Sequence, residues 1–110
     1  MEHPSQAAAK LIRELTELTD CLAERDIVVS SLQVEPSAFG GWVLVAEKRH
    51  EAIRFTWDGR DGFLTIESSP MPDNRRPKEW RQELLKGFDI VSGNSPVRFV
   101  VEYLKKRFPA

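Results

Sequence analysis

The sequence predicts a single α+β domain, in which an N-terminal helix, a four-stranded antiparallel sheet and two C-terminal helices share one core. Two patterns predict this class. Apolar residues recur at helical spacing near both ends of the chain, and the middle is rich in β-branched and aromatic residues interrupted by Gly, Pro and Asp. The length of 110 residues, with 41% hydrophobic and 30% charged residues, fits one domain over residues 1–110.

The first element is an amphipathic helix from Ser5 to Arg25, with charged residues on the face opposite its apolar stripe. Cys21 lies beside that stripe, and we expect a small, half-buried residue, because no neighbouring Cys or His supports metal or nucleophilic chemistry. Residues 1–4 and 109–110 are expected to be flexible ends. The stripe consists of Ala8, Leu11, Leu15, Leu18 and Leu22, broadened by Ala7 and Ile12.

Four strands follow, and their short links favour an antiparallel meander. Side-chain alternation sets the register, because only one register keeps apolar residues on one face and polar residues on the other. It leaves residues 49–50 and 59–62 as the two later hairpin loops. The strands are Ile27 to Val34, Trp42 to Lys48, Ala52 to Asp58 and Phe63 to Ser68. The expected pairs are Val34 with Trp42, Leu32 with Leu44, Trp42 with Trp57, Leu44 with Phe55, Trp57 with Leu64, Phe55 with Ile66, Arg54 with Glu67 and Thr56 with Thr65.

The C-terminal part begins with an exposed connector over residues 70–77, because its three prolines exclude a helix interior or a central strand. A second helix is expected from the stripe Trp80, Leu84, Leu85 and Phe88, ending near Gly87. Ser95 and Pro96 then indicate the start of a third helix. Its stripe is Val97, Val100, Val101, Leu104 and Phe108, and Pro109 ends it. The tryptophans Trp42, Trp57 and Trp80 all fall on apolar stripes and are expected in the core.

Catalytic and metal-binding patterns are absent from the sequence. It contains no Gly-rich phosphate loop, paired-cysteine spacing, zinc-protease motif or nucleophile elbow. We therefore expect no enzyme, no cofactor and no metal site, and Arg54 with Glu67 is interpreted as a cross-strand ion pair. An enzyme would require Asp58, Asp61 and His50 to converge in a pocket.

The charge is distributed unevenly along the chain. Residues 1–69 have a net charge of -5 and residues 70–110 a net charge of +4, although the whole chain is nearly neutral at -1. Basic residues on the C-terminal side are therefore candidates for binding a partner, either an acidic protein or, less readily, RNA. These candidate residues are Arg75, Arg76, Lys78, Arg81, Lys105, Lys106 and Arg107.

The strand from Ile27 to Val34 carries no charged residue and lies at an edge of the expected meander. An uncharged, β-branched edge invites pairing with another strand. We expect it to be covered by a short fifth strand at Ile90 and Val91, by a helix, or by the same strand of a second copy in a homodimer.

The leading hypothesis is a small non-enzymatic protein-binding or adaptor protein, comparable to secretion chaperones and immunity proteins by fold-level analogy only. The alternative is a weak nucleic-acid-binding module that uses the C-terminal basic clusters. A single cysteine and the lack of a secretory signal favour the cytoplasm. The longest apolar run, Trp42 to Ala46, is too short to cross a membrane, so no membrane partner is expected.

Overall fold

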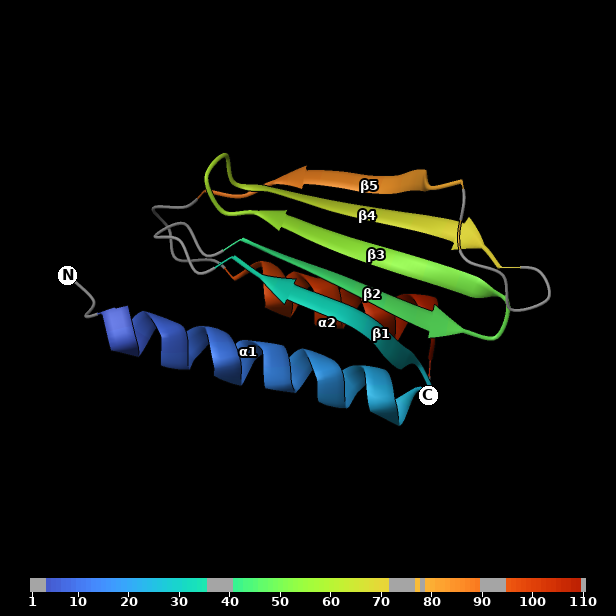
Figure 1. Cartoon of the computed structure of the whole chain (residues 1–110), viewed down its shortest axis with the longest axis horizontal. Coiled ribbons are helices and arrows are strands. Elements are labelled where there is room, and N and C mark those ends of the chain that lie inside the picture. Colours follow the sequence, from blue (N-terminus) through green and yellow to red (C-terminus); the bar gives the residue numbers. More distant parts are fainter. Residues whose placement is uncertain (1–3, 36–40, 72–76, 78, 90–94, 110) are drawn as a thin grey trace.

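The fold is a five-stranded antiparallel meander with two helices on one of its faces (Figure 1). The computed structural model describes residues 4–35, 41–71, 77, 79–89 and 95–109. The strands lie in the order β1-β2-β3-β4-β5. The α+β class and the meander are confirmed. Along the chain the elements are α1 (Pro4–Glu24), β1 (Val28–Val34), β2 (Trp42–Lys48), β3 (Glu51–Asp58), β4 (Phe63–Pro70), β5 (Arg81–Gly87) and α2 (Pro96–Arg107).

The register of the first four strands agrees with the sequence prediction at every expected pair. Two residues, Arg49 and His50, close the β2–β3 hairpin, and Arg49 adopts the left-handed φ of 56° that such a tight turn requires. Residues 59–62 form the next loop, in which an Asp58 carboxylate oxygen accepts the backbone N–H groups of Arg60 and Asp61 at 3.0 and 3.1 Å. Residues 59–62, which include Gly59 and Gly62, are therefore a turn that is held by hydrogen bonds to Asp58.

The core lies between the sheet and the two helices. Phe55, at the centre of β3, is 0% exposed, as are Leu18 of α1 and Leu104 of α2. Burying a side chain of this size contributes roughly 1.5–3 kcal/mol. The other core residues are Leu15, Cys21, Leu22, Ile27, Trp42, Leu44, Ala46, Ile53, Leu64, Ile66, Val97, Val100 and Val101.

From Leu11 onward, helix α1 follows its predicted stripe except at Ile12, which is 65% exposed and does not belong to the core. Cys21 is more deeply buried than expected, at 5% exposed, and burial raises the pKa of its thiol above the ordinary value. The helix ends in a left-handed cap: Asp26 has φ 58°, its N–H donates to the Ala23 carbonyl, and the N–H of Ile27 donates to the Leu22 carbonyl. Because this cap buries Ile27, it also fixes where β1 begins.

The expected second helix is wrong: its segment forms β5, which pairs antiparallel with β4. The sequence has good helix formers, but seven residues are too few to form a helix alone, whereas β4 offers a free edge. Leu84 pairs with Ile66 on the core face and Leu85 with Thr65 on the open face. The sheet therefore has five strands, and α2 is the single C-terminal helix among the described residues.

Two further expectations about this region require correction. Trp80 lies outside the core, with the Arg54 guanidinium 4.3 Å from the centre of its ring. The exposed connector predicted over residues 70–77 is wrong at its first two residues, since β4 runs to Pro70 and Met71 is buried at 5% exposed. Residues 72–76 of that connector lie outside the described residues. Trp42 is buried as expected, and Trp57 is partly buried against Phe88 in an edge-to-face contact.

Candidate functional site at the β1 edge

Strand β1 forms one edge of the sheet, and its side chains are mostly exposed. It pairs with β2 on one side only, and six of its seven residues are exposed. Val28, Leu32 and Val34 are 65%, 41% and 44% exposed, which is high for large apolar residues in a strand. The backbone groups on the outer side of β1 have no strand partner within the described part of the chain. This edge is therefore a template for strand addition.

A bulge interrupts β1 near its middle. The register with β2 shifts between Val29 and Ser31, and the Ser30 hydroxyl donates to the Val45 carbonyl at 3.1 Å. Bulges are one device by which natural sheets limit edge pairing. Within β1 the bulge is the only such device, because the strand contains no proline and no charged residue.

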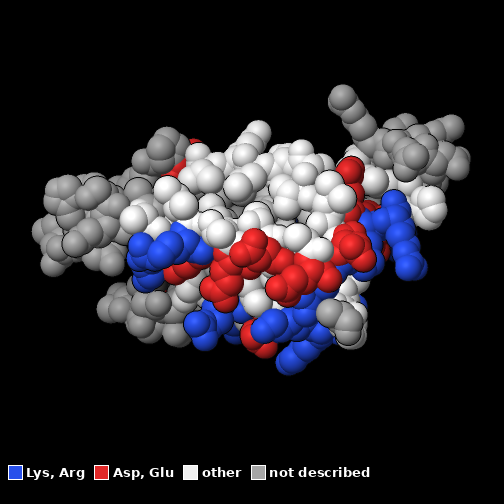
Figure 2. Space-filling model, turned by 90° about the horizontal axis from the view of Figure 1, so that it is seen from below, with Lys and Arg blue, Asp and Glu red and all other residues white. Residues whose placement is uncertain are grey.

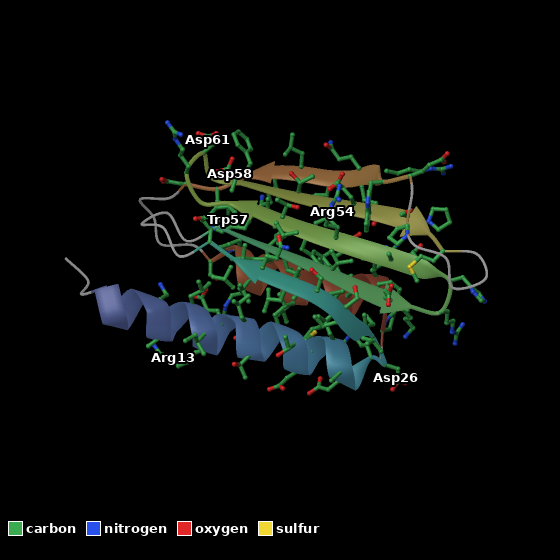
Figure 3. All side chains as sticks on the ribbon, viewed as in Figure 1. Arg13, Asp26, Arg54, Trp57, Asp58 and Asp61 are labelled. Atoms are coloured by element: carbon green, nitrogen blue, oxygen red, sulfur yellow. The ribbon has the colours of Figure 1, made fainter. Side chains whose placement is uncertain are left out.

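Acidic residues stand at both ends of this strand. Asp26 lies at the corner where α1 passes into β1 (Figure 3), and Glu35 directly follows Val34. Both residues are exposed. The Glu35 N–H donates to the Gly41 carbonyl at 2.7 Å, so the strand end is held in place.

Helix α1 borders the edge with a flank that carries no charge. Ile12, Thr19 and Ala23 share this flank, while Glu17, Asp20 and Glu24 project from a different side of the helix. In Figure 2 the acids form a band along α1, with basic residues of α2 on one side of the band and uncharged surface on the other. The flank of α1 that borders β1 is thus uncharged, and an acid stands at each end of the strand.

The opposite edge, β5, is charged and tied to α2. Arg107 of α2 donates to Glu51 of β3 at 2.7 Å and lies 3.2 Å from Glu83 of β5, and the Tyr103 hydroxyl donates to Glu83 at 3.0 Å. Burial, together with that hydrogen bond, raises the pKa of Tyr103 to about 12. Partial burial alone would lower the pKa of Arg107. The hydrogen bond to Glu51 and the negative charges of Glu51 and Glu83 outweigh it and raise that pKa above its ordinary value.

Two open grooves lie on the helix side of the molecule. One, of about 470 Å³, runs between α1 and α2, with Glu17, Asp20 and Glu24 on one wall and Lys105 on the other. The second, of about 330 Å³, lies where β5 meets the start of α2 and includes Lys86 and Arg98 as well as Glu102. Each groove contains charges of both signs, so neither favours an ion of one sign.

Of the seven basic residues proposed from the sequence, the structure describes four. Arg81 is exposed at the start of β5, and Lys105 and Lys106 are exposed near the end of α2, where Lys105 lies 3.6 Å from Glu102. The Arg107 guanidinium is engaged by two carboxylates. Arg75, Arg76 and Lys78 lie outside the described residues, as do Ile90 and Val91 of the expected covering strand.

The polar residues considered for catalysis do not meet. Asp58 and Asp61 stand at the β3–β4 turn (Figure 3), whereas His50 lies in the β2–β3 turn at the other end of β3. Arg54 donates to Glu67 at 2.9 Å on the open face of the sheet, as predicted. Within the described ranges no three His, Cys, Asp or Glu residues are grouped as a metal site would require. In the same ranges, no helix combines the length and apolar character needed to cross a membrane.

Comparisons with known proteins assign no family to the chain. No family model, no curated protein and no solved structure matches it.

The acids at the two ends of β1 were not singled out from the sequence. The signal was present in it, because one acid stands on each side of an eight-residue segment without charge, from Ile27 to Val34.

Proposed function

We propose that the chain is a non-enzymatic protein-binding or adaptor protein that takes up an extended segment of another protein along β1. The observation that supports this most directly is the exposure of β1, an uncharged edge strand with six exposed residues out of seven. Strand addition would satisfy the free backbone groups of β1, and the main-chain hydrogen bonds would supply the affinity. Alternate side chains of the added segment would contact the surface on either side of the edge.

The rest of the molecule provides a rigid support for such an edge. Residues Leu44 of β2 and Phe55 of β3 are 0% exposed, so the strands behind β1 are anchored in the core. A partner segment would therefore be ordered on a preformed template, which reduces the entropic cost of binding to that of the segment itself.

The test is affinity capture from the native host with the wild type and with Ser31→Lys, followed by mass-spectrometric identification. A lysine in the middle of an edge strand opposes strand pairing, so we expect the variant to lose the captured partner. Hydrogen exchange of the purified complex should show slower exchange of the β1 amides than in the free protein.

The matched control is Leu85→Lys, which places the same charge on the opposite edge strand at a residue that is 55% exposed. This variant should retain the partner. Capture of the same partner by Ser31→Lys, or unchanged exchange of the β1 amides in the complex, would contradict the proposed function.

The second candidate function, weak nucleic-acid binding, would use the exposed cations Arg81, Lys105 and Lys106 among the described residues. We expect any such affinity to be non-specific and to fall steeply with added salt, because phosphate contacts release counterions. Titration of labelled RNA at low and at physiological salt measures this. Submicromolar binding that survives physiological salt would rank nucleic acid above a protein partner.

A further inference from the structure

The acids at the ends of β1 determine what kind of segment fits the edge. Asp26 precedes the strand, Glu35 follows it, and both side chains are exposed. Building on the proposed function, we propose that the occupant is an extended segment of another protein with an uncharged centre and a Lys or Arg at each end. The spacing of Asp26 and Glu35 sets these two cations about nine residues apart.

Strand geometry brings the ends of an added segment close to both carboxylates. Paired strands lie about 4.8 Å apart, so a residue opposite the end of β1 is within reach of an ion pair through a long Lys or Arg side chain. Because the two ends of β1 carry the same charge, a segment with cations at both ends fits in the parallel and in the antiparallel direction. The ends therefore select by charge and not by direction.

The centre of the segment meets a different surface. The seven residues of β1 are uncharged, and the neighbouring flank of α1 presents the exposed Ile12 and Ala23 and the half-buried Thr19, none of which is charged. Ile12 is 65% exposed and offers apolar contact. A charged side chain at the centre of the segment would lose water without finding an opposite charge.

The same charges disfavour a second copy of this chain as the occupant. Antiparallel self-pairing centred between Ser30 and Ser31 would set Asp26 of each copy directly opposite Glu35 of the other. Each end of the paired strands would then hold two acids side by side, and like charges at such positions are destabilising. Phosphates of a nucleic acid would meet the same two acids.

The test uses three labelled synthetic peptides and measures fluorescence anisotropy with the full-length protein. The first is a decapeptide with Lys at both ends and eight alternating Val and Thr residues between them. The second replaces both Lys residues by Glu, and the third keeps Lys but has Pro at alternate central positions, which prevents strand pairing. We expect the first peptide to bind about tenfold more tightly than the second, since two exposed ion pairs are worth about that factor. The third peptide should not bind measurably, because it cannot form the main-chain hydrogen bonds of a paired strand.

The variant Asp26→Asn/Glu35→Gln should reduce the difference between the Lys-ended and Glu-ended peptides to about twofold or less. Asn tolerates the left-handed φ of 58° at position 26, so the cap of α1 is retained. The control, Glu17→Gln/Glu24→Gln, removes the same net charge from the acidic band of α1 and should preserve the difference. Equal losses in both variants would show that general attraction to an acidic protein, and not the strand ends, makes the selection.

Failure of this inference can be distinguished from failure of the proposed function. If the Lys-ended and Glu-ended peptides bind equally and both slow the exchange of β1 amides, strand addition stands and the charge selection is wrong. If no peptide slows that exchange, both are wrong. A wild-type dimer that Ser31→Lys dissociates, seen by light scattering, would show that the occupant is a second copy.

Discussion

β1 and β5 are both seven-residue edge strands of one sheet, yet β5 carries three charged residues and β1 carries none. Each edge also has a bulge, near Ser30 in β1 and near Glu83 in β5. At β5 the bulged Glu83 is held by Tyr103 and Arg107 of α2, whereas at β1 the bulge binds only the neighbouring strand. One edge thus carries charges and is tied to a helix through Glu83, whereas the other is uncharged and has no such tie among the described residues.

The largest expected effect concerns the centre of the sheet, which lies between the two edges and supports both. Phe55→Ala should lower the free energy of unfolding by about 3 to 5 kcal/mol, because the ring is 0% exposed and its removal leaves a cavity. On the opposite face of the same strand, Arg54→Ala should cost about 1 kcal/mol or less, as for a partly exposed ion pair. Urea melts of both variants measure this, and equal losses would contradict the assignment of the faces.

The next effect concerns the ties of the β5 edge. Arg107→Ala should lower the free energy of unfolding by about 1 to 3 kcal/mol, because it leaves Glu51 and Glu83 without their cation. The control is Lys106→Ala, a change at the exposed neighbouring residue. Its free energy of unfolding should stay within about 0.5 kcal/mol of the wild-type value. If thermal or urea denaturation gives the two variants the same stability, Arg107 does not tie β5 and β3 to α2.

A pH dependence should also belong to the β5 edge. The pKa of Tyr103 is raised to about 12 from the ordinary value of 10.0, so above pH 10 the unfolded state releases a proton that the folded state keeps. Rising pH therefore favours unfolding between these two values. Tyr103→Phe should remove this part of the decrease in stability, which urea melts at pH 9, 10 and 11 would reveal. An identical decrease in stability with pH in wild type and variant would contradict the role of Tyr103.

The smallest effect is expected at the β1 edge. Ser31→Lys should change the free energy of unfolding by about 0.5 kcal/mol or less, because Ser31 is exposed and the edge is not covered by described parts of the chain. Urea denaturation of the isolated variant measures this. Pronounced unfolding would mean that the chain itself covers the edge, and that the comparison between the two edges does not hold.

The part of the fold that could be predicted from sequence is the part set by local alternation. Because side chains of a strand alternate between faces, the pairs Trp57 with Leu64 and Arg54 with Glu67 followed from the sequence pattern. The segment Arg81–Gly87 was misjudged because its composition favours a helix, while its structure is decided by the free edge of β4. Trp80 was misplaced for the same reason.

The candidate site could be predicted in part. The uncharged strand was recognisable from its composition alone, but its position at an edge depends on which strands lie beside it. The role of Arg107 was not predictable, because its partner Glu51 lies 56 residues away in the sequence. Such distant pairs leave no periodic signal, so a cluster of basic residues does not reveal which of its members are already engaged.

The meander order of the strands has a consequence for how the chain folds. Every strand pairs with its neighbour in sequence, and the links between successive strands have seven, two, four and ten residues, so each pairing closes at low entropic cost. The helix layer is different, because α1 and α2 come from opposite ends of the chain. Ser95, the N-cap of α2, donates to Glu14 of α1, which is 81 residues away in the sequence. We therefore expect hairpin formation to be fast and the docking of the two chain ends to limit the folding rate.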